Sequence, residues 1–413
     1  MLLNRKIPNT PNLAKPKKKK SGMLDLGYLP YDVLPDILHG LPVKSLIRFR
    51  CVSKSWNSLI TSPAFINSKL TRSHSDSNKL IVMYLDVTLT PFVERYKLIH
   101  EESDDNDSSP EQIQDLKLPL RSRIRTYFQL VGSVNGLFCL HEQNRFILWN
   151  PCIRKFITLP NPSVTRGLFR ELAFGFDLRT DDYKVVRIGY QSGNISYEGA
   201  KPPMVEVYSV SEGSWRVTSG GDSYPPSITI GNWHPQAAYL NGAVYFAAND
   251  WGDAQSLIVL SFDLGDEVFR LISLPNGKFG LDSDIGTSVF NGLLSLICYG
   301  YQHLSTIKSC SVWVMKEYGV VDSWTKQFTI KLNMLRWEVL GFLKNDHVLV
   351  QKIESHGSML LSYDPESQQV KNLGFYRSKY YSYVDNYARN LTLLDKPNDV
   401  VSKRKVSKKR KCR

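Results

Sequence analysis

Cysteine and histidine are the residues of this chain best suited to catalysis or metal binding. The six cysteines stand at positions 51, 139, 152, 298, 310 and 412 without any CxxC spacing, and the eight histidines are scattered. A thioester-forming enzyme needs a cysteine whose pKa is lowered by a nearby base, and a zinc site needs closely spaced Cys and His ligands. HExxH, GxSxG and glycine-rich phosphate-binding motifs are also missing from the sequence. We therefore assign no catalytic residue, no metal and no cofactor.

One pair of carboxylates, Asp181 and Asp182, could in principle bind a metal or exchange protons. The pair directly precedes the apolar residues Tyr183, Val185 and Val186, which alternate as in a strand. Aspartate is common in the turn before a strand because its side chain bonds to nearby main-chain groups. We interpret the pair as part of a turn.

The net charge of +13 is concentrated in two tails. Residues 1–22 carry seven basic side chains and residues 402–413 carry eight, with no acid in either, which leaves about −2 between them. Such runs repel themselves and are predicted to be disordered. The tails could serve solubility or bind nucleic acid or anionic lipid. The C-terminal cluster is also a candidate nuclear-localisation signal, composed of Lys403, Arg404, Lys405, Lys408, Lys409, Arg410 and Lys411.

Hydropathy and cysteine usage indicate an intracellular protein. No apolar run approaches the 18 residues of a membrane span, and no apolar segment precedes the basic run at the N-terminus. Unpaired cysteines in a chain of this size favour a reducing compartment. We expect the nucleus and the cytoplasm and no membrane partner. The acidic stretch 101–111 is interpreted as a solvated loop.

Residues 29–70 have the apolar spacing of short amphipathic helices. Leucine, isoleucine and valine recur every three to four residues up to Leu41, and the pattern restarts after Pro42 and again near Trp56. Three short helices are predicted, the first capped by Asp32 because Pro35 fits only in a first turn, and the third stopped by Pro63. A module of this size rarely closes its own core, so a partner protein is expected.

This stretch resembles the F-box. The resemblance rests on Leu29-Pro30, Asp36-Ile37-Leu38, Leu41-Pro42-Val43-Lys44-Ser45-Leu46 and Lys54-Ser55-Trp56, with Pro35 a departure from the family's usual apolar residue. It implies binding to Skp1 and, through Skp1, to the cullin and RING subunits of a ubiquitin ligase. The residues implied for Skp1 binding are Leu29, Pro30, Leu34, Ile37, Leu38, Leu41, Pro42, Leu46, Val52 and Trp56.

Strand-like segments repeat about every 50 residues after residue 79. Asn135-Gly136, Asn241-Gly242 and Asn291-Gly292 each begin a unit and suit two-residue hairpin turns, and Asn345-Asp346 begins another. Such repeats are typical of a kelch-like β-propeller, with a β-sandwich as the alternative. Residues 79–101 could begin a further blade, and residues 380–387 could supply the strand that closes the ring. Trp149, Trp215, Trp313 and Trp324 are predicted to lie in the core between blades.

The same region resembles the F-box-associated domain of plant F-box proteins. The matching segments include Trp149-Asn150-Pro151, Phe174-Gly175-Phe176-Asp177 and Asp182-Tyr183-Lys184-Val185-Val186. The order of these features is similar to that of plant F-box proteins that repress pathogenesis-related genes. We expect a basic tail (1–22), an F-box (23–70), a β-propeller (71–395) and a second basic tail (396–413).

The resemblance implies a non-catalytic substrate adaptor of a Skp1–cullin–F-box (SCF) ubiquitin ligase, with a role in plant immunity. The alternative is a nuclear propeller protein that binds protein or nucleic acid outside a ligase. Propellers usually bind partners through loops at one end, here the segments 161–171, 190–203, 219–236, 249–256 and 300–308. Their aromatic residues are candidate target contacts, namely Tyr190, Tyr224, Trp233, Trp251 and Tyr301.

Overall fold

The structure is a computed structural model of the 413-residue chain. The residues that it describes are 33–73, 79–86, 93–100, 113–118, 120, 122, 127–164, 168–190, 202–231, 237–252, 256–275, 279, 283–303, 306–334, 336–343, 345–355, 357–376 and 382–396. The chain divides into two compact units, residues 1–42 and 43–413. The basic tails and the acidic stretch 101–111 lie outside the described residues.

Four short helices occupy the F-box region, where three were predicted. They are α1 (Leu34–His39), α2 (Val43–Phe49), α3 (Lys54–Ile60) and α4 (Pro63–Ser73). As predicted, α3 ends before Pro63, at Ile60. Pro63 is also the first residue of α4, a position where proline loses no hydrogen bond. The cap of α1 is Val33 and not Asp32, with Pro35 in the first turn as expected.

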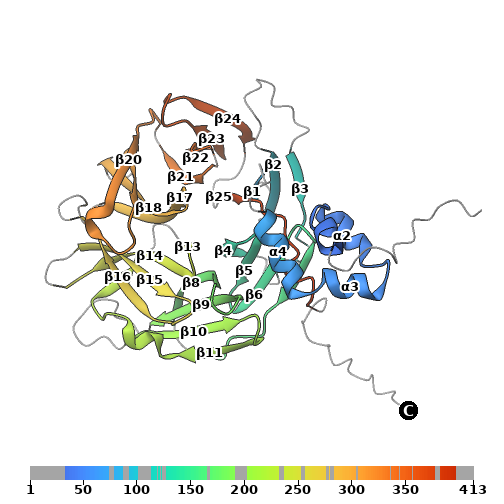
Figure 1. The fold of residues 1–413 in the computed structure, drawn as a ribbon. Coiled ribbons are helices and arrows are strands. Elements are labelled where there is room, and N and C mark those ends of the chain that lie inside the picture. Colours follow the sequence, from blue (N-terminus) through green and yellow to red (C-terminus); the bar gives the residue numbers. More distant parts are fainter. Residues whose placement is uncertain are drawn as a thin grey trace, which may run out of the picture. The chain divides into compact units, whose positions relative to one another are not determined.

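Six antiparallel sheets follow, so the described strands form a six-bladed propeller (Figure 1). From the inner to the outer edge, blade 1 contains β25 (Ser382–Asn386), β1 (Lys79–Asp86), β2 (Val93–His100) and β3 (Ile113–Leu116). Blade 2 contains β4 (Gln129–Val134), β5 (Leu137–Glu142), β6 (Arg145–Asn150) and β7 (Lys155–Thr158). Blade 3 contains β8 (Leu168–Asp177), β9 (Asp182–Tyr190), β10 (Met204–Ser209) and β11 (Ser214–Thr218).

Blade 4 differs in that two short strands together form its inner edge. They are β12 (Ile228–Ile230) and β13 (Ala238–Leu240), which both pair with β14 (Ala243–Asp250), followed by β15 (Ser256–Asp263) and β16 (Phe269–Ser273). Blade 5 contains β17 (Asp284–Phe290), β18 (Leu293–His303), β19 (Thr306–Met315) and β20 (Trp324–Ile330), and blade 6 contains β21 (Trp337–Phe342), β22 (Val348–Glu354), β23 (Gly357–Tyr363) and β24 (Val370–Tyr376). Two 3₁₀ helices, η3 (Ser219–Ser223) and η4 (Val321–Ser323), precede blade 4 and β20.

The blades are held together by six apolar clusters, one at each junction of neighbouring blades. Strand β1 shows how this is done, since Ile81 and Met83 face blade 2 while Leu80 and Val82 face blade 6. A strand that is covered on both faces needs apolar residues at consecutive positions. This requirement explains unbroken apolar runs such as residues 80–85. The six separate sheets show that the domain is a propeller and not a sandwich.

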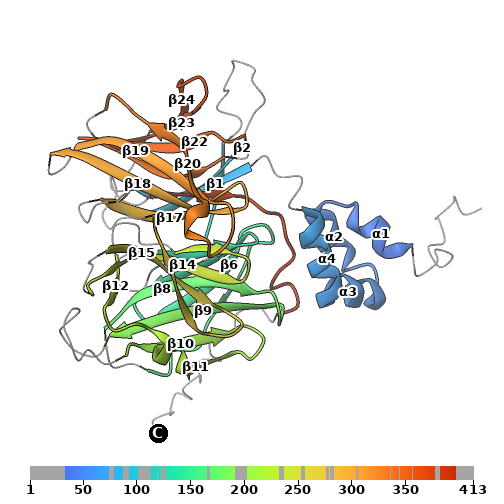
Figure 2. The ribbon, with the colours of Figure 1, turned by 60° about the vertical axis from the view of Figure 1, so that its left-hand side comes forward.

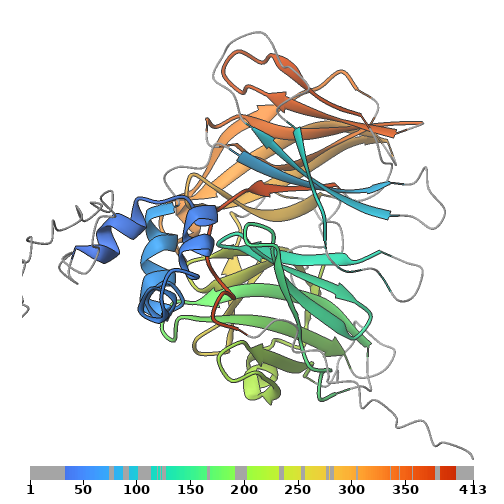
Figure 3. The ribbon, with the colours of Figure 1, turned by 90° about the vertical axis from the view of Figure 1, so that its right-hand side faces the viewer.

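The hairpin turns confirm the repeat seen in the sequence. Asn135, Asn241 and Asn291 have φ values of 55°, 49° and 50°, and the glycines after them are also positive, as a type I′ turn requires. The predicted closing strand is confirmed as well, because β25 pairs with β1 from Leu80 opposite Asn386 to Tyr84 opposite Ser382. Figure 3 shows the red β25 beside the blue β1.

The chain continues past β25 as a buried segment, which we call the C-terminal strap (residues 388–396). Ala388, Leu391, Leu393 and Leu394 are buried, and Leu393 belongs to the cluster between blades 2 and 3. A side chain on Gly136 would come within 2.3 Å of the Ala388 carbonyl oxygen, so the strap passes directly over that turn. The strap extends ring closure from blade 1 to blade 2.

Two buried asparagines hold the strap in place. Asn150 Nδ2 donates to Asn390 Oδ1 at 2.5 Å and to the Thr392 carbonyl oxygen at 2.9 Å. Asn390 Nδ2 donates in turn to the Asn135 carbonyl oxygen at 2.7 Å. Asn390, which begins an Asn-x-Thr sequence, is fully buried in this network. Residues up to 395 were predicted to belong to the propeller, but the buried course of residues 388–396 was not predicted.

Candidate functional site

The F-box residues predicted to bind Skp1 fall into three groups by exposure. Ile37 and Val52 expose 45% and 56% of their surface, and Pro42 is also exposed. Leu34, Leu41 and Trp56 are half-buried. Leu29 and Pro30 lie outside the described residues. Apolar side chains exposed on so small a module are suited to contact with another protein.

Leu38 and Leu46 were predicted as contact residues, but both are fully buried within the chain. A side chain without exposed surface stabilises the module instead of touching a partner. The prediction is corrected for these two residues. In contrast, Val33 was not predicted and is 44% exposed. It lies four residues before Ile37, so the two share one face of the first turn of α1.

The position of Trp56 is set by local contacts. Ser53 caps α3, since its Oγ accepts from the Trp56 main-chain N at 3.1 Å. The Trp56 ring packs edge-on against Phe49 at 5.4 Å between centroids. Arg50 Nε also donates to Asn57 Oδ1 at 2.9 Å, which ties the end of α2 to α3. These contacts orient the half-buried indole at the α2–α3 corner.

The described ends of the predicted target-binding segments lie at one end of the propeller, which we call the loop end. The Asn-Gly turns of blades 2, 4 and 5 and the Asp177–Asp182 turn of blade 3 join the first and second strands, so the connections between the second and third strands leave from the opposite end. The segments 190–203, 249–256 and 300–308 are connections of this second kind, while 161–171 and 219–236 lead from one blade to the next. Figure 2 shows the blades from the side.

Two of the predicted aromatic contacts meet between blades 3 and 4. The hydroxyl groups of Tyr190 and Tyr224 are 2.9 Å apart, and Tyr224 also donates to the Ile228 carbonyl oxygen at 3.2 Å. Burial raises the pKa of Tyr190 to about 12, so this phenol is a neutral hydrogen-bonding group at physiological pH. Tyr224 is only 4% exposed, so its assignment as a direct target contact is corrected. Its hydroxyl group instead bonds to that of Tyr190.

Trp251 is an exposed aromatic residue of this region. The residue exposes 47% of its surface, while its indole Nε1 donates to Thr229 Oγ1 at 2.6 Å. The Trp251 main-chain N donates to the Ser227 carbonyl oxygen at 2.9 Å, which holds it beside the 224–230 segment that carries Tyr224. Trp233 lies outside the described residues, and so does the side chain of Tyr301. Tyr190 and Trp251 are thus the predicted contacts that both bond to the 224–230 segment and are at least partly accessible.

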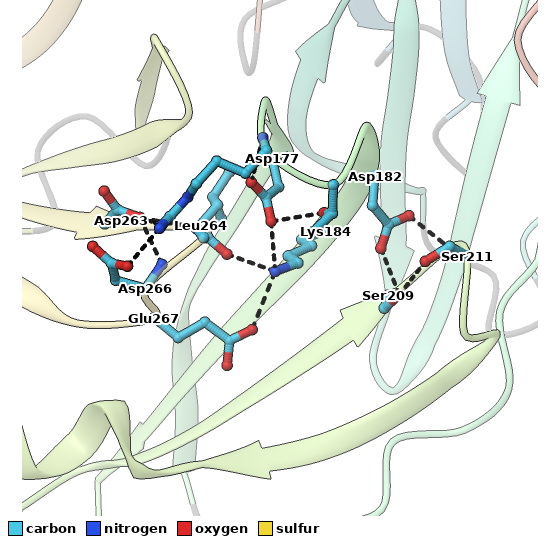
Figure 4. A network of polar contacts seen from close by, with 12 residues as sticks. Asp177, Asp182, Lys184, Ser209, Ser211, Asp263, Leu264, Asp266 and Glu267 are labelled. Carbon is cyan, nitrogen blue, oxygen red and sulfur yellow. Dashed lines mark hydrogen bonds and ion pairs between the residues drawn. The ribbon is translucent and has the colours of Figure 1, made fainter. Parts of the chain in front are cut away.

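The Asp181–Asp182 pair belongs to the turn between β8 and β9, as predicted. Asp181 has a positive φ of 52°, and the buried Asp182 accepts from Ser209 Oγ at 2.5 Å and from the Ser211 main-chain N at 2.8 Å (Figure 4). The carboxylate therefore anchors the neighbouring β10–β11 turn. It has no geometry for a catalytic pair.

The nearby Lys184 joins blade 3 to blade 4. Its buried Nζ lies 3.0 Å from Asp177 Oδ2 and 3.3 Å from Glu267 Oε1, and donates to the Leu264 carbonyl oxygen at 2.6 Å (Figure 4). Burial alone would raise the pKa of Asp177, but hydrogen bonds from Thr180, the Arg179 main-chain N and Lys184 lower it below its usual value. Burial would also raise the pKa of Glu267, but the hydrogen bond from Arg216 and the charges of Arg216 and Lys184 outweigh burial. The pKa of Glu267 is therefore lowered. The network is a structural junction between the blades.

This junction predicts a loss of stability in acid. Because the pKa of Asp177 is lower in the folded state than in the unfolded chain, its contribution is complete above the unfolded value of about 4 and is lost as the pH falls through the folded value. We expect the thermal midpoint of unfolding to decrease as the pH drops below about 4. The decrease should be less steep for the Asp177→Asn variant. Asp322→Asn, which alters an exposed carboxylate of η4, is the matched control and should keep the steep profile. Equal acid profiles for Asp177→Asn and the unmodified chain would contradict this account.

Three thiols of the propeller are buried, namely those of Cys139, Cys298 and Cys310. Burial raises the pKa of Cys139, Cys298 and Cys310, which keeps these three groups protonated at neutral pH. Among the described residues no cluster of three or more His, Cys, Asp or Glu side chains is arranged to hold a metal ion. Within the same residues no helix combines the length and apolar character needed to cross a membrane.

The predicted core tryptophans bind neighbouring blades together. Trp149, Trp215 and Trp324 are buried and Trp313 is half-buried, where it packs against the blade 4–5 cluster. Trp215 and Trp324 occupy matching positions in β11 and β20. Each donates its indole N–H to a carbonyl oxygen of the preceding blade, Pro160 at 2.8 Å and Ser273 at 3.3 Å. Their role is structural, as expected.

Comparison with known proteins agrees with both parts of the chain. Residues 26–68 match the F-box domain family, and residues 87–396 match the family described as F-box associated beta propeller domain. F-box protein CPR1 of Arabidopsis thaliana is 30% identical, covering 73% of this chain and 73% of its own length. F-box protein At3g07870 of the same plant is 28% identical over 90% of this chain and 93% of its own length.

Among solved structures, TolB from Acinetobacter baumannii aligns with a TM-score of 0.45 at 10% identity, covering 78% of this chain and 70% of its own. The family matches are much more extensive in sequence, and the structure shows the helices and the six blades that they describe. The chain therefore belongs to the F-box proteins that carry an F-box-associated β-propeller domain.

Proposed function

We propose that the protein is a substrate-recognition adaptor of an SCF ubiquitin ligase. The F-box binds a Skp1-like protein and, through it, the cullin and RING subunits. The propeller holds a target protein for ubiquitination and proteasomal degradation. The observation that supports this proposal most directly is the exposure of apolar F-box side chains, namely Val33 and Ile37 in the first unit and Val52 in the second.

Such a surface is unfavourable in water and favourable in a protein interface. Fully burying one aliphatic side chain contributes about 1.5–3 kcal/mol. Val33 and Ile37 stand on one face of α1, and Leu34 beside them is half-buried. A partner that covers this face would gain from each of them. We propose that Ile37 and Val52 are principal contacts and that Leu34, Leu41, Pro42 and Trp56 also contribute.

The propeller suits the second half of the task. Holding a target in a fixed place raises its effective concentration near the transferring enzyme, so no catalytic residue is required of the adaptor itself. Six tightly packed inter-blade clusters give the domain the rigidity that positioning requires. We propose Tyr190 and Trp251 at the loop end as target contacts, because aromatic residues often dominate such interfaces.

The decisive test is co-expression with a Skp1-like protein followed by pull-down. We expect Ile37→Asp or Val52→Asp to reduce the recovered Skp1 at least about tenfold, because each places a charge in an apolar contact. Val217→Asp is the matched control, since Val217 is similarly exposed on the outer strand of blade 3. Undiminished Skp1 recovery by both F-box variants would refute the docking assignment, provided their melting curves match that of the control.

Pathway and location are proposed on narrower grounds. The likeness to plant F-box proteins suggests an immune regulator as the target. The cluster Lys403 to Lys411 suggests nuclear import alongside a cytoplasmic pool. Comparing proteins that accumulate on the full chain and on an F-box deletion during proteasome inhibition tests the pathway. A protein that binds both the full chain and the F-box deletion, but is stabilised only by the deletion, would support degradation. Retention of the full chain on nucleic acid would instead favour a role outside a ligase.

A further inference from the structure

The loop end of blades 3 and 4 carries accessible side chains that adjoin one another. The Tyr190 hydroxyl group bonds to that of Tyr224, which donates in turn to the Ile228 carbonyl oxygen. Ile228 lies directly opposite Asp250 in the β12–β14 ladder, and Trp251 follows Asp250 in the chain. Opposite Cα atoms in such a ladder are only about 4.5–5.5 Å apart. Tyr190 of blade 3 and Trp251 of blade 4 therefore belong to one continuous surface.

Two half-buried carboxylates face the same junction. Glu171 lies opposite Ile188 in blade 3 and Asp250 lies opposite Ile228 in blade 4, and both isoleucines belong to the apolar cluster between these blades. Directly opposite residues of a ladder project from the same face, so Glu171 and Asp250 also project toward the junction. Burial chiefly raises the pKa of Tyr190, and the charge of Glu171 raises it further, which indicates that this carboxylate is near the phenol. We define the 3–4 loop-end surface as Glu171, Tyr190, Asp250 and Trp251.

The described basic side chains of blades 3 and 4 are paired elsewhere. Four of them form ion pairs with Asp263 or Glu267 at the end of blade 4 opposite the loop end, namely Arg179, Lys184, Arg216 and Arg270. The fifth, Arg187, is buried against Glu206. In the part of the chain that the structure describes, the 3–4 loop-end surface is therefore aromatic and acidic.

We propose that the 3–4 loop-end surface binds an arginine side chain on an exposed segment of the target protein. This inference rests on the proposed function and adds the chemical class of the segment that is recognised. Charge complementarity favours a cation beside two carboxylates. The exposed indole favours a planar cation, because a guanidinium group can stack on the ring while it donates to carboxylate oxygens. The indole N–H of Trp251 already donates to Thr229, so the side chain interacts with a target through its ring.

The propeller contains the same combination of groups once, with its own arginine in place. At the junction of blades 2 and 3, Arg187 pairs with Glu206 while its guanidinium carbon lies 5.6 Å from the centre of the Trp215 ring. A carboxylate and an indole thus hold an arginine in this fold. The 3–4 loop-end surface presents the same two kinds of group at the surface, where a target can supply the arginine.

Binding at Trp251 can be followed directly on the full chain. Tryptophan is replaced by 5-fluorotryptophan, the ¹⁹F signal of Trp251 is identified with Trp251→Phe, and the protein is titrated with the capped peptide Gly-Gly-Arg-Gly-Gly. We expect a saturable shift of the Trp251 signal, and weaker binding as salt is added. The same peptide with citrulline, which keeps the shape of arginine but not its charge, should bind at least about tenfold more weakly. The peptide with lysine should also bind more weakly, because an ammonium group is compact and strongly hydrated.

Two isosteric variants make the test specific. Asp250→Asn removes one charge and keeps the oxygen that accepts from the Gly252 main-chain N at 3.0 Å, and Glu171→Gln removes the other charge. Each should weaken binding of the arginine peptide at least about fivefold, because a charge-assisted hydrogen bond becomes a neutral one. Asp181→Asn is the matched control, since Asp181 is exposed at the opposite end of blade 3, and it should leave the titration unchanged. The ¹⁹F signals of the other tryptophans show whether each variant is folded.

The proposal is overturned if the Trp251 signal does not respond to the arginine peptide, if the citrulline or lysine peptide binds equally well, or if both carboxylate variants bind as before. A Trp251 signal that moves when the chain is ended after Lys396 would also overturn it, because the chain's own basic tail would then be the occupant. Skp1 recovery by Asp250→Asn should equal that of the unmodified chain. Failure of the arginine contact therefore leaves the adaptor role standing, and failure of Skp1 docking leaves the peptide titration unchanged.

Discussion

Truncation after Tyr387 should cost the propeller most of its stability. The deletion removes the C-terminal strap, whose Leu391, Leu393 and Leu394 are buried. Burial of three leucines contributes roughly 5 kcal/mol or more, which is comparable to the whole net stability of many domains. The deletion also leaves the amide of Asn150 buried without its partners Asn390 and Thr392. We expect a chemical denaturation midpoint far below that of the full chain, or no folded protein.

A second truncation provides the control. Ending the chain after Lys396 removes the basic tail, residues 397–413, and keeps the entire strap. Its midpoint should match that of the full chain, because the buried strap residues Leu391, Leu393 and Leu394 are all kept. Similar midpoints for the two truncated chains would show that the strap does not stabilise the ring.

Replacement of Arg187 by methionine should be the most damaging single substitution in the propeller. Arg187 is buried against the fully buried carboxylate of Glu206, and its guanidinium lies over the rings of Phe146 and Trp215 at 5.8 and 5.6 Å. Removing one partner of a buried ion pair leaves an uncompensated charge and costs about 3–5 kcal/mol. Denaturant titration should show this loss at pH 7.

Arg270→Met is the matched control for this substitution. Arg270 is half-exposed and pairs with Asp263 and Asp266 at 3.3 and 3.1 Å. Exposed pairs contribute about 0–1 kcal/mol, so the control should remain close to the unmodified protein. If Arg187→Met were as stable as Arg270→Met, the buried pair could not be a major support of the blade 2–3 junction.

Local patterns in the sequence predicted the propeller well because its blades are built from local hairpins. Asn-Gly turns mark where the second strand of a blade begins, and the strands follow one another with little interruption. The closing strand was also predictable, because residues 380–387 form a strand-like remnant that has no blade of its own. The likeness to the F-box family likewise placed the helical module correctly.

The wrong predictions concern contacts between residues that are distant in the sequence. Tyr224 was predicted to be a surface aromatic residue, but it is buried and its hydroxyl group contacts that of Tyr190. Leu38 and Leu46 share the helical spacing of Ile37, and only the packed structure separates buried from exposed members. The strap has no strand or helix period, and its main anchor joins Asn150 to a residue 240 positions away. Such contacts have no local signature in the sequence.

The pairing of β1 with β25 has a consequence for synthesis of the protein on the ribosome. Strand β1 begins at Lys79, but its inner neighbour ends at Asn386, so blade 1 stays incomplete until nearly the whole chain has emerged. At about 5–20 residues per second, that interval is on the order of 15–60 s. During this time β1 presents an unpaired edge, which is a template for wrong pairing. Chaperone demand should therefore concentrate on nascent chains in which blades 2 to 6 have emerged and blade 1 still awaits β25.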